Sequence, residues 1–220
     1  MKVAIIGVGT TAMIVADIIM ESHNFKLAGF VGTSEEEKVL RSSNIYRDIS
    51  FLGDRGIVDK LNKGDIQGFI CAIGDEYIRE KAFYECSEAG LTPINAISSK
   101  VVINPDVSLG RGVVISPGVI LSHGVKIGDN VILDSAVVMD VNVSVGAHSY
   151  LSPGVVISGG CVIEKNVRMG AGVIVENGLK IGKNQKIAII GVENWGENGF
   201  KQAGDLDAAC RNINNNDFKI

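Results

Sequence analysis

The chain has 220 residues and a formal net charge of −4, without a basic run or a basic patch interleaved with aromatic residues, so nucleic-acid binding is not expected. Four scattered cysteines and three distant histidines show neither disulfide nor metal-site spacing. We therefore expect no bound metal, and we expect the protein to work in a reducing cytoplasm. The apolar run at residues 1–7 is too short for a signal peptide or a membrane span, and we expect neither.

The first 97 residues alternate between short apolar strands and helical patterns. The expected strands cover residues 2–6, 26–31, 68–72 and 92–96, and the expected helices cover residues 10–19 and 76–89. Strand–helix alternation of this kind predicts a parallel sheet covered by helices. We therefore expect a small Rossmann-like α/β domain over residues 1–97.

A glycine-rich turn, with Gly7, Gly9 and then Thr10, follows the first expected strand. Glycines here let the backbone approach a phosphate, and the helix N-terminus adds N–H donors and the positive end of its dipole. An NAD site would place an acidic residue at the end of the second strand, but residues 29–34 hold none, so NAD is not expected. A nucleotide-linked sugar fits the turn equally well, and so does a tight turn without any ligand.

Residues 101–187 repeat every six positions. Aliphatic side chains occupy fifteen consecutive hexads without a break in phase, from Ile103 to Ile187. A period of six is typical of short strands joined by tight turns, as in a hexapeptide β-helix. Valine and isoleucine suit the strands, and glycine, asparagine and aspartate suit the corners. We predict a parallel β-helix of about five coils over residues 98–192, and a polar tail over residues 193–220 with a short helix at residues 205–211.

The two halves together resemble the NeuD/PglD-like sugar acyltransferase family. The resemblance rests on Ile-Ile-Gly-Val-Gly at residues 5–9, the segment before a helix at residues 72–79, and the junction at residues 94–107 that leads into the hexads. It covers roughly residues 2–187. The family implies a left-handed β-helix, a homotrimer, a nucleotide-linked amino sugar held by the α/β domain, and acetyl-CoA in the groove between neighbouring β-helices.

On this resemblance, the candidate substrate-binding residues are Gly7, Gly9, Thr10, Gly74 and Asp75. Small residues that let a pantetheine arm lie on the backbone, and lysines that suit phosphates, are the candidates for binding acyl-CoA: Ser158, Gly159, Gly170, Ala171, Lys183 and Lys186. Charged corners on a solvated coil explain the lysines equally well. Trp195 is a candidate for stacking on adenine or for covering the open end of the β-helix.

Three hexads per coil, which the family implies, stack residues 18 apart at a spacing of about 4.8 Å and place His123, Val141, Gly159 and Asn177 in one column. Aligned without a gap, the family's catalytic histidine falls on Val141, between Asp140 and Asn142. A slip of one coil would place His123 on the motif, with Gly124 in the position of its acidic partner. We favour the first alignment; in either, the usual histidine–acid pair is incomplete.

The absence of the usual histidine–acid pair has a chemical consequence. An alcohol, with a pKa near that of water at about 15.7, is a poor nucleophile without a base. An amine with a pKa of roughly 8 is partly neutral at pH 7 and can attack a thioester unaided. We therefore predict transfer of an acyl group to an amine and not to an alcohol. The resemblance implies that the group, expected to be acetyl, comes from acyl-CoA, that the amine belongs to a nucleotide-linked amino sugar, and that the product enters a route to surface glycans.

The candidate catalytic residues are His123, Asp140 and Asn142. Each is also explained as an ordinary corner residue, exposed or hydrogen-bonded within its turn, and His148 is expected to face outward at another corner. A catalytically inactive trimeric homologue that retains the nucleotide-sugar pocket would show the same loss of the histidine. The sequence thus leaves open whether the protein is an enzyme.

Overall fold

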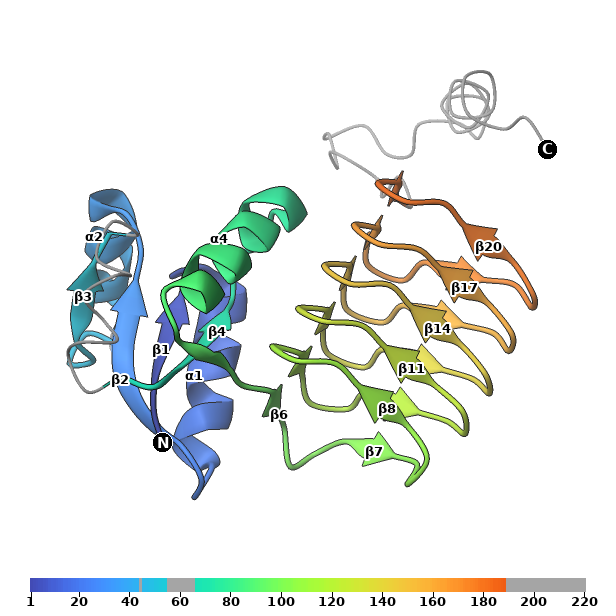
Figure 1. Cartoon of the computed structure of the whole chain (residues 1–220), viewed down its shortest axis with the longest axis horizontal. Coiled ribbons are helices and arrows are strands. Elements are labelled where there is room, and N and C mark those ends of the chain that lie inside the picture. Colours follow the sequence, from blue (N-terminus) through green and yellow to red (C-terminus); the bar gives the residue numbers. More distant parts are fainter. Residues whose placement is uncertain (44, 55–65, 189–220) are drawn as a thin grey trace, which may run out of the picture. The chain divides into compact units, whose positions relative to one another are not determined.

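The computed structural model describes residues 1–43, 45–54 and 66–188. Residues Met1–Ile187 form one compact unit, in which an α/β domain is followed by a parallel β-helix (Figure 1). The predicted fold class is therefore confirmed. The predicted tail, Trp195 and the helix at residues 205–211 lie outside the described residues.

A five-stranded parallel sheet in the order β3-β2-β1-β4-β5 forms the centre of the α/β domain. Its strands are β1 (Lys2–Ile6), β2 (Lys26–Val31), β3 (Phe51–Gly53), β4 (Gly68–Cys71) and β5 (Thr92–Pro93). The helices are α1 (Thr10–Glu21), α2 (Ser34–Ser42) and α4 (Glu76–Glu88). The sequence patterns did not indicate α2 or β3.

Helices cover both faces of this sheet. Val3 and Ile5 pack in one cluster with α1, whereas Ala4 and Ile6 pack in another with α4. Because successive side chains of a strand point to opposite faces, α1 and α4 lie on opposite sides. Burial on both faces explains why β1 is apolar at every position after Lys2.

The order of the sheet reverses at β1, which has β2 on one side and β4 on the other. In open α/β sheets, ligands bind in the crevice beyond the carboxyl ends of the strands at such a reversal. Gly7 follows β1 there with φ +113°, and a Cβ at this position would lie 2.9 Å from the carbonyl oxygen of Ala72. Only glycine fits this turn.

Two-residue strands build the β-helix. They are β6 (Ala96–Ile97), β7 (Val102–Ile103), β8 (Ser108–Leu109), β9 (Val114–Ile115), β10 (Ile120–Leu121), β11 (Lys126–Ile127), β12 (Ile132–Leu133), β13 (Val138–Met139), β14 (Ser144–Val145), β15 (Tyr150–Leu151), β16 (Val156–Ile157), β17 (Val162–Ile163), β18 (Arg168–Met169), β19 (Ile174–Val175), β20 (Lys180–Ile181) and β21 (Lys186–Ile187). By pairing with β9, β6 joins the β-helix although it precedes residue 98, the predicted start of that domain.

These strands form three faces. The first face holds β7, β10, β13, β16 and β19; the second holds β8, β11, β14, β17 and β20, which are stacked in Figure 1; the third holds β6, β9, β12, β15, β18 and β21. Each strand pairs in parallel with the strand 18 residues away, as Ile120 does with Val138. Three hexads per coil are thus confirmed. From β7 onward, the second residue of each strand packs into the core and the first points outward.

Three corners join the faces. We name them by one residue each: the His123 corner joins the first and second faces, the His148 corner joins the second and third, and the Pro153 corner joins the third and first. Corner residues with positive φ are mostly glycine and asparagine, the residues that tolerate a left-handed backbone. His148 is an exception, with φ +62°.

Candidate functional site

The outward column of the third face changes from apolar to charged along the β-helix. Val114 and Ile132 are buried in a cluster with α1 residues, and Tyr150, Arg168 and Lys186 continue the column at the same 18-residue spacing. The charged end of the column contacts the turn between β4 and α4. The third face is therefore the surface that receives the α/β domain.

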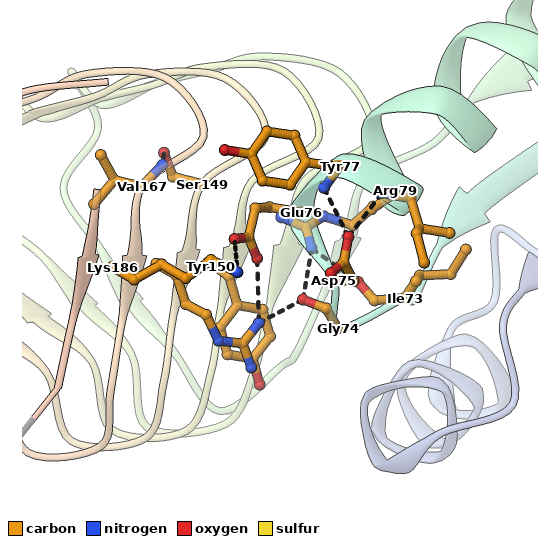
Figure 2. Close-up of polar contacts among 12 residues, drawn as sticks. Ile73, Gly74, Asp75, Glu76, Tyr77, Arg79, Ser149, Tyr150, Val167 and Lys186 are labelled. Atoms are coloured by element: carbon orange, nitrogen blue, oxygen red, sulfur yellow. Dashed lines mark hydrogen bonds and ion pairs between the residues drawn. The ribbon is translucent and has the colours of Figure 1, made fainter. Parts of the chain in front are cut away.

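Glu76, at the start of α4, is the centre of this contact (Figure 2). Its side chain is 1% exposed, with Lys186 Nζ 3.0 Å from Oε1 and Arg168 Nη1 3.4 Å from Oε2. Burial acts to raise the pKa of Glu76, but a hydrogen bond from its own backbone N–H and the charges of Lys186 and Arg168 outweigh it, so the pKa is lowered. The carboxylate is ionised at neutral pH.

Arg79, one turn further along α4, is fully buried. Its guanidinium donates to four carbonyl oxygens: those of Ile73 (2.8 Å), Gly74 (3.2 Å), Asn130 (3.3 Å) and His148 (2.6 Å). Burial lowers the pKa of Arg79 to about 10, which still leaves it charged at neutral pH. Arg79 thus ties the turn after β4 to the β-helix.

The crevice at the reversal of the sheet opens into a cavity of about 430 Å³. It is lined by Gly7, Val31, Gly32, Thr33, Glu36, Asp54, Ile73 and Ile78. None of these lining residues is basic. Thr33 and Glu36, which form the capping box of α2, are lining residues that the sequence patterns did not single out; a threonine followed three residues later by a glutamate was the available signal.

The structure brings the five predicted substrate-binding residues to this end of the sheet. Gly9 caps α1 without a side-chain hydrogen bond, and Thr10 is the first residue of that helix. A Cβ on Gly9 or on Gly74 would meet no atom within 4 Å, so both positions are open. The Asp75 carboxylate accepts from the N–H groups of Tyr77 (3.1 Å) and Ile78 (2.9 Å), so its local role is to cap α4.

The predicted catalytic column lies at the His123 corner. The N–H of Asn142 donates to the carbonyl oxygen of His123 (2.8 Å), and that of Gly160 donates to the carbonyl oxygen of Val141 (2.9 Å). A Cβ added to Gly159 would lie 3.4 Å from both Asp140 Oδ2 and Val141 Cγ2. His123, Asp140, Asn142 and Gly159 therefore share one corner, and Val141 is 44% exposed among them.

His123 has an acidic partner that the hexad spacing did not identify. Its Nδ1 lies 3.1 Å from Asp106 Oδ1, and the other carboxylate oxygen of Asp106 accepts from the N–H of Gly124 (2.8 Å). Asn104 Oδ1 is 3.3 Å from the same ring nitrogen. His123 thus pairs with Asp106 of the coil below, while Val141 and Gly124 still occupy the positions where the family's histidine and acid were expected.

The predicted acyl-CoA residues are spread over the β-helix. Ser158 and Gly159 lie at the His123 corner, Gly170 and Ala171 at the Pro153 corner, and Lys183 at the His148 corner. Lys186 lies on the third face and is paired with Glu76. A single chain does not bring these residues together, and their role stays a prediction.

The His148 corner is covered by α4, contrary to the expectation that His148 faces outward. The side chain is 3% exposed, with Nε2 3.6 Å from Glu80 Oε1 and 3.4 Å from the Tyr84 hydroxyl. Asn130 Nδ2 is 3.0 Å from Nδ1. Burial lowers the pKa of His148, against the attraction of Glu80. This histidine is part of the domain junction.

No helix within residues 1–43, 45–54 and 66–188 is long and apolar enough to cross a membrane. Across the same part of the chain, no three His, Cys, Asp or Glu side chains gather in a way that could hold a metal ion.

Comparison with known proteins adds a domain match and a set of structures with a similar fold. Residues 2–86 match the PglD N-terminal domain, and no curated protein matches the chain. The acetyltransferase domain of PglB from Neisseria gonorrhoeae FA1090, solved in complex with acetyl coenzyme A, is similar with a TM-score of 0.75 and 20% identity, covering 85% of this chain and 87% of that one.

A point mutant of perosamine N-acetyltransferase from Caulobacter crescentus, in complex with CoA and GDP-perosamine, has a TM-score of 0.70 and 24% identity, with 90% and 98% of the two chains covered. WeeI from Acinetobacter baumannii AYE has a TM-score of 0.72 and 18% identity, with 88% and 92% covered. These structures share the fold of this chain. The matched domain supports the resemblance to PglD-like proteins over residues 2–86.

Proposed function

From a PglD N-terminal domain joined to a hexapeptide β-helix, we propose that this protein transfers an acyl group, acetyl in the first instance, from acyl-CoA to the amino group of a nucleotide-linked amino sugar. The observation that carries the proposal is the His123 corner. There His123 pairs with the Asp106 carboxylate, and the Asp140 carboxylate and the Asn142 amide lie at the same corner beside Gly159 and Gly124. The similar structures solved with acetyl-CoA, or with CoA and GDP-perosamine, support the choice of substrates.

The reaction requires one bond to form and one to break. The neutral amine nitrogen attacks the thioester carbonyl carbon, a C–N bond forms, and the C–S bond breaks to release CoA. His123 is placed to take the proton that the amine loses. Because Nδ1 faces the Asp106 carboxylate, Nε2 carries the lone pair that accepts the proton. The proton then returns to the departing thiolate, which leaves as a thiol.

Asp140 and Asn142 complete the proposed site. The Asp140 carboxylate attracts the sugar ammonium before that group loses its proton, and the Asn142 amide is a donor for the carbonyl oxygen on which negative charge develops. Gly159 keeps the backbone open for the pantetheine arm, since a Cβ there would crowd Asp140 and Asn177. Backbone groups at Gly7, Gly9, Thr10 and Gly74, beside the capped turn at Asp75, hold the nucleotide-linked sugar.

We also propose a cytoplasmic homotrimer whose product serves surface-glycan synthesis. The first face supports the trimer, because its outward column is apolar: Val102, Ile120, Val138, Val156 and Ile174. Ile174 is 70% exposed in a single chain. A second copy would cover this column and would bring the His123 corner of one chain near a different corner of the next. Light scattering should report a trimer that Ile120→Glu disrupts and Lys126→Glu, on the second face, does not.

Calorimetric titration with acetyl-CoA tests the function. We expect micromolar affinity and about one site per subunit, followed by release of CoA thiol when UDP- and GDP-linked amino sugars are supplied. Failure of an intact trimer to bind acetyl-CoA would contradict acyl transfer. It would favour the second candidate, an inactive homologue with a nucleotide-sugar pocket, for which the half-exposed Val141 at the expected histidine position argues.

A further inference from the structure

Arg168 lies between the two turns that frame the crevice of the α/β domain. Its Nη1 donates to the carbonyl oxygen of Gly74 (2.6 Å) and pairs with Glu76, on the turn after β4. Its guanidinium carbon stands 4.6 Å from the centre of the Tyr150 ring. The Tyr150 hydroxyl donates to Asp134 Oδ2 (2.8 Å), and Tyr150 packs in one hydrophobic cluster with Ala12 and Val15 of α1. A β-helix residue thus reaches the place where α1 and α4 both begin.

Charge at this place is uneven. The cavity lining includes the acidic residues Glu36 and Asp54 and no basic residue, so the α/β domain offers no cation of its own there. The cluster at the junction, in contrast, holds three cations, Arg79, Arg168 and Lys186, around two carboxylates, those of Glu76 and Asp75. Arg79 is fully buried, and its N–H groups donate to carbonyl oxygens. The positive charge that is accessible to a ligand therefore belongs to Arg168 and Lys186.

Arg168 also has donors to spare. Both of its polar contacts use Nη1, and among the described residues no atom accepts a hydrogen bond from Nη2 or Nε. The Tyr150 ring and the Gly74 carbonyl hold the planar group in one orientation. An oriented guanidinium with free N–H groups matches the oxygens of a phosphate in two-point contacts.

We propose that Arg168 binds the diphosphate of the nucleotide-linked sugar, so that the nucleotide site is completed by the β-helix and selects nucleoside diphosphates. This inference rests on the proposed function. Lys186 acts through Glu76 as a positioning residue, since its ion pair holds the turn that Arg168 contacts. Substrate binding and the junction between the domains then depend on the same arginine.

Calorimetry with UDP, GDP, the two monophosphates and acetyl-CoA tests this assignment. Arg168→Gln should weaken binding of the preferred diphosphate at least tenfold, change monophosphate binding less, and leave acetyl-CoA affinity unchanged. Arg168→Lys, which keeps the charge but not the planar fork, should fall between wild type and Arg168→Gln. Lys126→Gln removes one cation from the second face and should have no effect.

Four outcomes would overturn the inference. If Arg168→Gln binds the diphosphate with an affinity within twofold of wild type, Arg168 does not contact the diphosphate. If Arg168→Gln loses affinity for diphosphate and monophosphate equally, and its melting temperature falls to a value that Arg168→Lys does not restore, then Arg168 has only a structural role. If wild-type protein binds acetyl-CoA but neither UDP nor GDP, the nucleotide site is rejected and the proposal of acyl transfer stands. If wild-type protein binds neither acetyl-CoA nor a diphosphate, both proposals are rejected.

Discussion

Two histidines of the same β-helix stand at comparable corners and have different surroundings. His123 is 70% exposed, and its carboxylate partner, Asp106, comes from the adjacent coil of the same domain. His148 is 3% exposed, and its partner, Glu80, comes from α4 of the other domain. Both are near a carboxylate, so proximity to an acid does not distinguish a reacting histidine from a structural one.

The two histidines differ in how accessible their rings are to solvent and to a substrate. The ring of His148 is enclosed by Phe83, Tyr84 and Asn130, and every polar atom near it belongs to the domain junction. The ring of His123 has one nitrogen directed at Asp106 and stands on a part of the surface with glycines above it. The same corner geometry thus serves assembly in one place and is open to chemistry in the other.

The largest effect should come from His148→Ala. This change removes a buried ring that lies 5.5 Å from Tyr84 and 5.8 Å from Phe83 between ring centres, and it puts alanine at φ +62°. We expect a loss of about 3–4 kcal/mol in the free energy of unfolding, measured with urea.

His148→Asn is the matched control, because asparagine already occupies this left-handed position at Asn130 and Asn166. It should lose about 1 kcal/mol less than His148→Ala, and His123→Ala should change stability by less than about 0.5 kcal/mol. Equal stability of His148→Ala and wild type would show that α4 does not depend on this ring.

The next effect is catalytic. His123→Gln should lower kcat about 100-fold, or about 2.7 kcal/mol in the barrier, because the amine then loses its proton without a placed base. The urea midpoint and the affinity for acetyl-CoA should stay at wild-type values. A kcat within twofold of wild type would mean that the amine reacts unaided and that the open histidine is a surface residue.

Asp106→Asn should have a smaller effect of the same kind. An asparagine oxygen can still accept from the N–H of Gly124, but the charge that orients and stabilises a protonated His123 is lost. We expect kcat to fall about tenfold, or about 1.4 kcal/mol, with KM unchanged. Asp129→Asn is the control, because Asp129 pairs with Arg111 at the other corner; a similar fall there would point to general damage.

The smallest effect concerns pH. Burial lowers the pKa of His148 in the folded protein, near Glu80, Arg79, Lys165 and Asp129, so acidification protonates the unfolded chain first. Stability should therefore fall as the pH drops below about 6.5 and continue to fall until the folded pKa is passed. Between pH 7.5 and 5.5, wild type should lose up to about 1 kcal/mol more than His148→Asn; parallel curves would contradict this.

The fold was predictable where its signals are periodic. The hexads predicted short strands and tight corners, and the resemblance to a family with three hexads per coil predicted the observed 18-residue pairing. The alternation of apolar strands and helices indicated the parallel sheet. Strand β3 escaped detection because three residues are too few to show a pattern, whereas α2 carried a capping box that could have been recognised.

In the candidate site, contacts between residues stacked 18 apart were predictable from the sequence, and contacts between residues of different columns or different domains were not. Stacking of residues 18 apart predicts that His123 lies beneath Val141, and the hydrogen bond between the backbones of Asn142 and His123 agrees with this placement. Asp106 is 17 residues from His123, one short of a coil, and its diagonal reach depends on rotamers that spacing does not show. The cover over His148 and the partner of Lys186 come from α4, which only tertiary packing brings to the β-helix.

Helix α4 has a consequence for how such a chain can change in length. Phe83 rests against Gly112, Arg79 spans Asn130 and His148, and Glu80 bonds Asn166. An extra 18-residue coil inserted between Gly112 and Asn166 would satisfy every repeat, every corner and the apolar core. It would still slide these contacts out of line by one step of about 4.8 Å. Contacts with α4 thus fix the number of coils between Gly112 and Asn166, which the repeat by itself would not limit.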